Sequence, residues 1–329
     1  MFAQKPKSSL PDDALSDVFA ANLTPQKKHA STRNLIKRNY VLYLFLLPAL
    51  IYILVFSYIP LYGIQLAFKT FDSALGIWGS PWVGFQWFEM FFSSPRFWTL
   101  IGNTLSISLF TLVVGFPIPI ILALMLNSVK SQRFKKICQT ATYLPHFISV
   151  VVLVGMLTAF LSPRSGFITT LLEPFFGERV YFMGEAQFFD PIYVWSSVWQ
   201  DAGWSSIIYI AALAGVSPEL HEAALMDGAS RLKRIRYIDI PAIIPTITIL
   251  LILRCGSIMS VGFEKVLLMQ NNLNLQASEI ISTYTYKLGL LQNQYSYSTA
   301  IGLFNNVINF TILVLVNRFA KKISGESLW

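Results

Sequence analysis

Uncharged runs, made mostly of apolar residues, alternate along the chain with shorter segments that carry the charges. Four of these runs contain no Asp, Glu, Lys or Arg, and they cover residues 39–68, 97–129, 137–163 and 288–317. Each run is longer than the roughly 20 residues with which a helix crosses a bilayer. The hydrophobic pattern therefore predicts four membrane-spanning helices at these places.

Two further apolar runs are each interrupted by one charged residue. Run 191–218 contains Asp201, and run 240–263 contains Arg254. With these two, the sequence predicts an all-α membrane protein of six transmembrane helices. The composition agrees, because 54% of the 329 residues are hydrophobic and only 13% are charged, and the mean hydropathy is +0.54. These values are typical of a membrane protein and not of a soluble domain.

The positive charges identify the cytoplasmic side. The formal net charge is +8, and most Lys and Arg residues fall before the first predicted helix, in alternate loops and after the last, in segments 27–38, 130–136, 231–236 and 318–322. Cytoplasmic loops carry such an excess of Lys and Arg, so both termini are expected in the cytoplasm. The excess of positive charge therefore reports the orientation of the chain in a lipid bilayer, and no nucleic-acid partner is inferred from it.

These boundaries give a simple domain organisation. We expect a cytoplasmic tail over 1–39, a six-helix transmembrane domain over 40–323 and a short cytoplasmic tail over 324–329. The outer loops are too short for a soluble domain of their own, and the longest cytoplasmic loop is 217–241.

The sequence offers little for an enzyme or a metal site. A phosphate-binding loop of the P-loop type requires a Gly-Lys pair, and the chain contains none. Its histidines, His29, His146 and His221, are scattered, and its two cysteines, Cys138 and Cys255, fall at different predicted depths. Neither catalytic residues nor metal ligands are therefore assigned.

The loop 217–241 has the pattern of a short helix, a turn and a second helix. Ser217 is suited to cap a helix that starts with Pro218, and the Glu219 side chain would lie near the positive end of that helix. Gly228 is suited to end it, and the basic stretch 231–236 follows. One interpretation is an amphipathic loop held at acidic lipid headgroups. A second interpretation of the loop depends on a more specific sequence pattern within it.

The residues Glu222-Ala-Ala-x-x-Asp-Gly-Ala229, followed by Ile238-Asp-Ile-Pro241, resemble the Glu-Ala-Ala loop of permease subunits in bacterial binding-protein-dependent ABC importers. In that family the loop holds a coupling helix, which docks in a cleft of the cytoplasmic ATPase subunit. The resemblance implies the architecture of a type I ABC importer permease. It also implies that the residues that couple this chain to an ATPase are Glu222, Ala223, Ala224, Asp227, Gly228 and Ala229.

The resemblance extends over most of the chain and narrows the cargo. Several segments are similar to the permeases that import polysaccharide-derived sugars, and among these to the importers of alginate oligosaccharides. They are Asn103-Thr-Leu, 204–215, 261–265, Tyr297-Ser-x-x-Thr-Ala-Ile-Gly-Leu-Phe304 and Ser327-Leu-Trp329. The resemblance thus implies an oligosaccharide substrate, with acidic, alginate-like sugars as one candidate.

The same family implies partners and a place in the cell. These are a second, related permease, two ABC ATPase subunits and an extracytoplasmic solute-binding protein, assembled in the bacterial inner membrane. ATP and Mg²⁺ would be bound by the ATPase subunits, and this chain would bind no cofactor of its own.

Polar residues inside the predicted helices are candidates for the substrate path. A central Arg254 costs at least about 2.5 kcal/mol on insertion scales, so it must face protein or water. It either has a structural partner, such as Asp201, or lines the path, where a guanidinium would pair with a sugar carboxylate. Glu264 is either a solvated loop end or a path residue. The last helix offers side chains that would hydrogen-bond a sugar or a neighbouring helix, Asn305, Asn306 and Asn309.

One alternative function shares the composition. A secondary transporter or facilitator of small polar solutes also has several membrane helices with polar residues inside them. Such a protein has no need of an ATPase-docking loop, so the Glu-Ala-Ala pattern is the feature that separates the two functions.

Overall fold

The computed structural model describes residues 39–325 and 327–329, and these residues are almost entirely helical. The one β pairing in this part of the chain is an isolated bridge between Lys69 and Trp82. The expected all-α class is confirmed. All of the predicted N-terminal tail except Asn39 lies outside the described residues. The chain divides into two compact units, 1–62 and 63–329, which are described separately.

The described part of the first unit is one apolar helix. It consists of α3 (Tyr40–Ile53), which continues as the π-helical turn η1 (Leu54–Tyr58). Within the described chain neither element has a buried residue, and apolar side chains project on all sides. A helix that is apolar all round belongs in lipid or against another apolar surface. The span continues through η2 (Ile59–Phe68) and has 29 residues in total.

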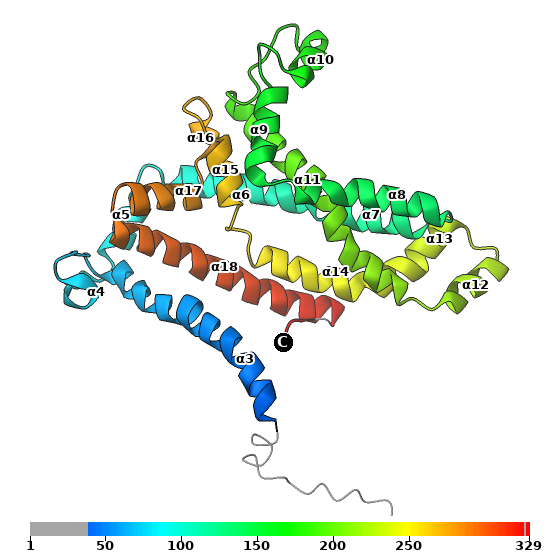
Figure 1. Ribbon diagram of the computed structural model, residues 1–329, viewed down its shortest axis with the longest axis horizontal. Coiled ribbons are helices and arrows are strands. Elements are labelled where there is room, and N and C mark those ends of the chain that lie inside the picture. The colour runs from blue at the N-terminus through cyan, green and yellow to red at the C-terminus, as the bar shows by residue number, and fades with distance from the viewer. Residues whose placement is uncertain (1–38, 326) are drawn as a thin grey trace, which may run out of the picture. The chain divides into compact units, whose positions relative to one another are not determined.

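The second unit contains the remaining helices, which Figure 1 labels in part. They are, in chain order, α4 (Gly76–Gly79), α5 (Gln86–Phe92), α6 (Phe97–Gly115), α7 (Pro117–Asn127), α8 (Gln132–Tyr143), η3 (Leu144–Phe147), α9 (Val150–Phe160), α10 (Phe167–Phe176), α11 (Ala186–Ala214), α12 (Pro218–Met226), α13 (Arg231–Arg234), η4 (Ile235–Asp239), α14 (Ile240–Cys255), α15 (Phe263–Met269), α16 (Leu275–Ser278), α17 (Ile281–Tyr286), η5 (Lys287–Leu291) and α18 (Tyr295–Ser324).

Among the described residues, four helices are long and apolar enough to cross a membrane: Tyr40–Phe68, Phe97–Asn127, Arg231–Cys255 and Tyr295–Lys322. A fifth candidate is a pair of helices, Gln132–Phe147 and Val150–Phe160, that meet at an angle of 97°, so the third predicted segment is sharply bent and not one straight helix. The sixth predicted segment is α11, which has 29 residues but does not qualify as a span by the same measure of length and composition. The predicted count of six is therefore roughly matched.

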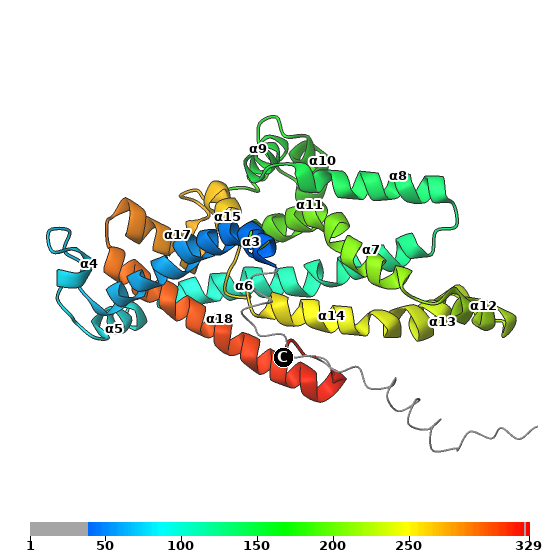
Figure 2. The same ribbon diagram turned by 60° about the horizontal axis from the view of Figure 1, so that its bottom comes forward.

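Helix α11 is the centre of the second unit. It contacts α6, α7, α8 and α14, and Figures 1 and 2 show it beside α6 and α7. Its packing against α8 is close, since a Cβ on Gly203 would lie 2.0 Å from the carbonyl oxygen of Thr142. Only glycine permits that backbone approach. Helix α14 packs mainly along α18.

The fifth membrane segment differs from the prediction. The sequence predicts one apolar run over 240–263, whereas α14 ends at Cys255 and a short helix, α15, starts only at Phe263. The intervening stretch contains Gly256 and Gly262, which lower helix stability, and several serines that compete for backbone hydrogen bonds. Periodicity alone did not reveal this break.

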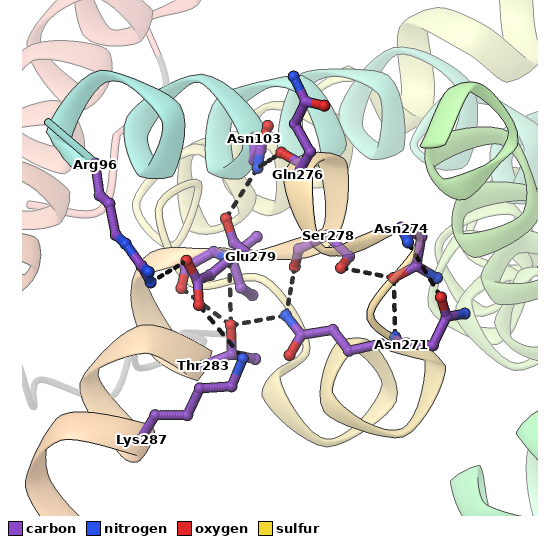
Figure 3. A network of polar contacts seen from close by, with 11 residues as sticks. Arg96, Asn103, Asn271, Asn274, Gln276, Ser278, Glu279, Thr283 and Lys287 are labelled. Atoms are coloured by element: carbon purple, nitrogen blue, oxygen red, sulfur yellow. Dashed lines mark hydrogen bonds and ion pairs between the residues drawn. The ribbon is translucent and has the colours of Figure 1, made fainter. Parts of the chain in front are cut away.

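A polar network fixes the loop that follows α15 (Figure 3). The Glu279 carboxylate forms ion pairs with Arg96, at 3.1 Å, and Lys287, at 3.3 Å. Asn103 on α6 donates to the carbonyl oxygens of Gln276 and Glu279. The side chain of Glu279 is only 10% exposed, so its charge depends on these two cations for compensation.

We predict that Glu279→Gln lowers the stability of the folded chain by about 1 to 3 kcal/mol. This loss of stability is smaller than the loss expected for a fully buried ion pair, because Arg96 is largely exposed. The midpoint of thermal unfolding in detergent should fall. Glu264→Gln is the matched control, since Glu264 is exposed and belongs to none of the ion pairs of the described residues. An equal fall for both variants would contradict the prediction.

Candidate functional site

Two adjoining cavities lie between the membrane helices of the second unit. The larger has a volume of about 590 Å³ and the smaller about 300 Å³. Both are lined by Thr111 from α6, Ser197 and Asp201 from α11, and Arg254 from α14. The shared residues make the two cavities one continuous candidate site, contributed by three helices that are far apart in sequence.

Arg254 lies in the last turn of α14, directly before the break in the fifth segment. Its side chain is exposed to the cavities, and none of the ion pairs in the described part of the chain includes it. The C-terminal end of a helix is negative, so a cation is favoured there. The helix end therefore offsets part of the cost of this charge and leaves the guanidinium available to a ligand.

Asp201, the structural partner considered for Arg254, pairs instead with His146. The Nδ1 atom of His146 lies 2.9 Å from Oδ1 of Asp201. The imidazole also stacks on the indole ring of Trp204, with ring centroids 4.6 Å apart and planes 6° apart. All three residues line the larger cavity. An aromatic surface, an acid and a histidine thus face the same space as Arg254.

The smaller cavity is lined by five residues of the break, Ser257, Ile258, Ser260, Val261 and Gly262. Side chains from two other helices hydrogen-bond this irregular stretch. Asn309 of α18 accepts from the Met259 N–H, at 2.9 Å, and donates to the Ser260 hydroxyl, at 3.0 Å. The hydroxyl of Tyr193 on α11 accepts from the Gly262 N–H, at 3.1 Å. Non-helical backbone at membrane depth requires such partners, and it occurs where it lines a cavity.

Lys265 follows the break and is buried against α11. Its ammonium donates to the carbonyl oxygen of Tyr193, at 3.1 Å, and to the hydroxyl of Ser197, at 2.6 Å. It also lies 4.9 Å from the centre of the Tyr193 ring, a cation–π distance. These contacts hold α15 on α11 beside the smaller cavity.

The other candidate path residues lie elsewhere. Glu264 is exposed on α15, and neither cavity is lined by it. Asn306 is also exposed, whereas Asn305 is partly buried and its Oδ1 has no hydrogen-bond partner among the described residues. Asn309 bonds the neighbouring segment, as described above. The structure therefore brings Arg254, but none of these four residues, to the cavities.

The loop 217–241 has the expected helix–turn–helix form. The Ser217 hydroxyl accepts from the Glu219 N–H, at 3.3 Å, and so caps α12 at its start. Gly228 has a φ of +72°, in the left-handed region, directly after the helix. The Ala229 N–H then donates to the Ala224 carbonyl, at 2.8 Å, and the Gly228 N–H to the Leu225 carbonyl. Together these bonds form a Schellman motif, in which glycine is favoured.

Helix α12 lies at one end of the second unit, opposite α5 (Figures 1 and 2). In the described chain α12 has no buried residue, although it contains Leu220, Leu225 and Met226, which are 55%, 53% and 88% exposed. Glu222, Ala223 and Asp227 are also exposed, and Ala224 is partly so. Apolar side chains left uncovered at the tip of a membrane protein indicate an interaction surface.

Sequence reasoning missed the parts of the site that depend on tertiary contact. It did not assign His146 or Trp204 to the cavities, it did not predict the contacts of Lys265 with α11, and it did not predict the break. One available signal was the histidine within an otherwise uncharged apolar run, preceded by Pro145. A second signal, for the break, was the presence of two glycines, Gly256 and Gly262, within one apolar run.

The cavities are lined by one cation, Arg254, by the acid Asp201, and by several aromatic rings and hydroxyl groups. Such a set of groups is suited to hold a polar ligand.

Comparisons with known proteins agree with this arrangement. Residues 115–325 match the family described as binding-protein-dependent transport system inner membrane component. Protein LplB of Bacillus subtilis is 44% identical over 294 residues, which cover 89% of this chain and 92% of LplB. The polygalacturonan/rhamnogalacturonan transport system permease protein YteP of the same organism is 44% identical over 312 residues, or 95% of this chain and 97% of YteP.

Two solved structures are also similar. One is a bacterial ABC transporter involved in the import of the acidic polysaccharide alginate, with a TM-score of 0.81 and 42% identity over 88% of this chain and 98% of the matched chain. The other is a bacterial alginate ABC transporter in complex with an alginate pentasaccharide-bound periplasmic protein, with a TM-score of 0.83 and 40% identity over 91% and 100%. Because residues 115–325 match its model and two relatives are 44% identical over most of their length, this chain belongs to the family of binding-protein-dependent transport system inner membrane components, the permease subunits of ABC importers.

Proposed function

We propose that this chain forms half of the translocation path for acidic oligosaccharides and is driven by ATPase subunits through α12. In this proposal a second permease completes the path, two ABC ATPases bind on the cytoplasmic side, and an extracytoplasmic binding protein delivers the sugar. ATP and Mg²⁺ act on the ATPases. Both termini lie in the cytoplasm of a bacterial cell, in accord with the distribution of Lys and Arg.

The observation that carries the choice of cargo is the position of Arg254. It faces both cavities, and the one acid that shares them, Asp201, is paired with His146. A guanidinium without a carboxylate of its own is suited to bind one from a sugar, because this pairing is bidentate and charge-assisted. The relatives support the same class of cargo, because one similar transporter is involved in the import of the acidic polysaccharide alginate and YteP is a polygalacturonan/rhamnogalacturonan transport system permease.

The observation that supports coupling is the exposure of α12 together with its capped ends. The Schellman motif at Gly228 ends α12, and the Ser217 cap marks its start. Ala223 and Ala224 are small enough to allow another surface to approach closely. In this proposal Glu222 and Asp227 make charged or capping contacts with the ATPase, and Ala229 closes the turn.

We predict that Arg254→Met lowers uptake of an acidic oligosaccharide about tenfold or more in proteoliposomes that contain the assembled transporter. Loss of a charge-assisted hydrogen bond costs about 1.5 to 3 kcal/mol, and 1.4 kcal/mol is a factor of ten. Uptake of a carboxyl-reduced, neutral analogue of the same length should change little. Arg254→Lys keeps the charge and should retain part of the acidic uptake. Equal loss with both sugars, together with poor assembly, would instead indicate a structural role.

We predict that Gly228→Arg uncouples ATP hydrolysis from uptake while the chain still inserts in the membrane. The open space around Gly228 admits a side chain, but its φ of +72° does not suit one. A residue other than Gly or Asn in this region costs about 1 to 2 kcal/mol, which is enough to disturb the end of a short helix. The number of sugars imported per ATP hydrolysed is the measurement.

Gly228→Asn is the matched control, because Asn tolerates the left-handed conformation. It should keep uptake per ATP near that of the unsubstituted protein. Normal uptake per ATP in Gly228→Arg would argue against a coupling role for this turn.

A further inference from the structure

His221 and Asp239 connect α12 to the helix that carries Arg254. The Nε2 atom of His221 lies 3.4 Å from Oδ1 of Asp239, and their side chains are 25% and 6% exposed. The contact is an ion pair when the imidazole is protonated. It lacks hydrogen-bond geometry, since Asp239 Oδ1 has no hydrogen bond within the described residues. A nearly buried carboxylate at the start of a membrane helix thus faces a side chain of the exposed loop helix.

This contact matters because little else holds α12 in place. Between residues 39 and 325 it is the one ion pair that joins α12 to another helix, and no side-chain hydrogen bond does so. The helix buries none of its residues against the rest of the described chain. Apart from its two backbone connections, α12 is therefore positioned by His221.

Asp239 lies on a continuous path to the candidate site. It is the last residue of η4 and is followed directly by α14, and α13, η4 and α14 together form the single span Arg231–Cys255. Arg254 is the next-to-last residue of that span. A displacement of α12 that is transmitted to Asp239 therefore reaches Arg254 through one continuous span.

We propose that the His221–Asp239 contact makes α12 and α14 move together, so that His221 and Asp239 are positioning residues for coupling. The proposal rests on the proposed role of α12 in docking an ATPase. Without the His221–Asp239 contact, a movement of α12 would change the conformation of the turn at 227–230 and would not reach α14, because Gly228 is conformationally permissive. Hydrolysis would then continue with less movement of the helix that carries Arg254.

The test uses the assembled transporter in proteoliposomes, with bound ATPase, ATP hydrolysis and sugar uptake measured for each variant. His221→Gln and Asp239→Asn should retain the ATPase subunits and their hydrolysis. Sugar imported per ATP should fall about fivefold or more, the lower end of typical couplings between sites. His221→Lys restores a cation and should recover most of the uptake. Lys233→Gln removes an exposed positive charge from the same loop and should change nothing.

A distance measurement gives a second readout that does not depend on uptake. Spin labels are placed at Leu220→Cys and Tyr237→Cys, two exposed positions on α12 and η4, in a background with Cys138→Ser and Cys255→Ser. The label distance should be narrow and equal with and without ATP, and it should broaden in His221→Gln. Unchanged uptake per ATP in both His221→Gln and Asp239→Asn would overturn the proposal, as would loss of assembly that His221→Lys does not repair. An unsubstituted chain that binds no ATPase would instead refute the proposed function.

Discussion

The site depends on a stretch of membrane-segment backbone that is not helical and must still be hydrogen-bonded. Between α14 and α15 the N–H groups of Met259 and Gly262 bond the side chains of Asn309 and Tyr193. An unsatisfied backbone group in the hydrocarbon region costs several kcal/mol, so these two side chains are what allow the helix to stop at Cys255. Because the helix stops there, Arg254 lies at a helix end and faces the cavities instead of lipid.

The same break is bonded to two neighbouring helices, α18 and α11. Asn309 comes from α18 and Tyr193 from α11, and Lys265 binds the backbone of α11 on the far side of the break. The segment that follows α14, beside the cavities, is thus hydrogen-bonded to α18 and to α11. In the proposed mechanism a shift of α14 changes the surroundings of Arg254, because the segment after the helix is fixed to its neighbours while the helix itself is connected to α12.

The sequence was sufficient to predict the membrane segments, because each must be apolar over a fixed length whatever it packs against. It was also sufficient for the loop 217–241, where Ser217, Pro218 and Gly228 act through local backbone geometry. It was not sufficient for the break over 256–262, since the run 240–263 remains apolar and the bonds that permit the break come from residues far away in the chain. The contacts His146–Asp201 and His221–Asp239 could not be predicted for the same reason, because their members are 55 and 18 positions apart.

The Asn residues of the last helix illustrate why the spacing of polar residues does not decide between two roles. Both a sugar contact and a helix contact were compatible with the spacing of Asn305, Asn306 and Asn309. In the structure the Asn309 side chain accepts a hydrogen bond from the backbone of the fifth segment, and Asn306 is exposed outside the cavities. Polar residues in membrane helices are indeed often structural, because each polar group needs a partner there.

If this chain is one permease of a transporter powered by separate ATPases, native mass spectrometry of the complex, extracted gently from its own membrane, will reveal the partners. We expect one particle that contains this chain, one related permease and two P-loop ATPases. A folded chain that is isolated alone, with no ATPase under any extraction condition, would contradict it.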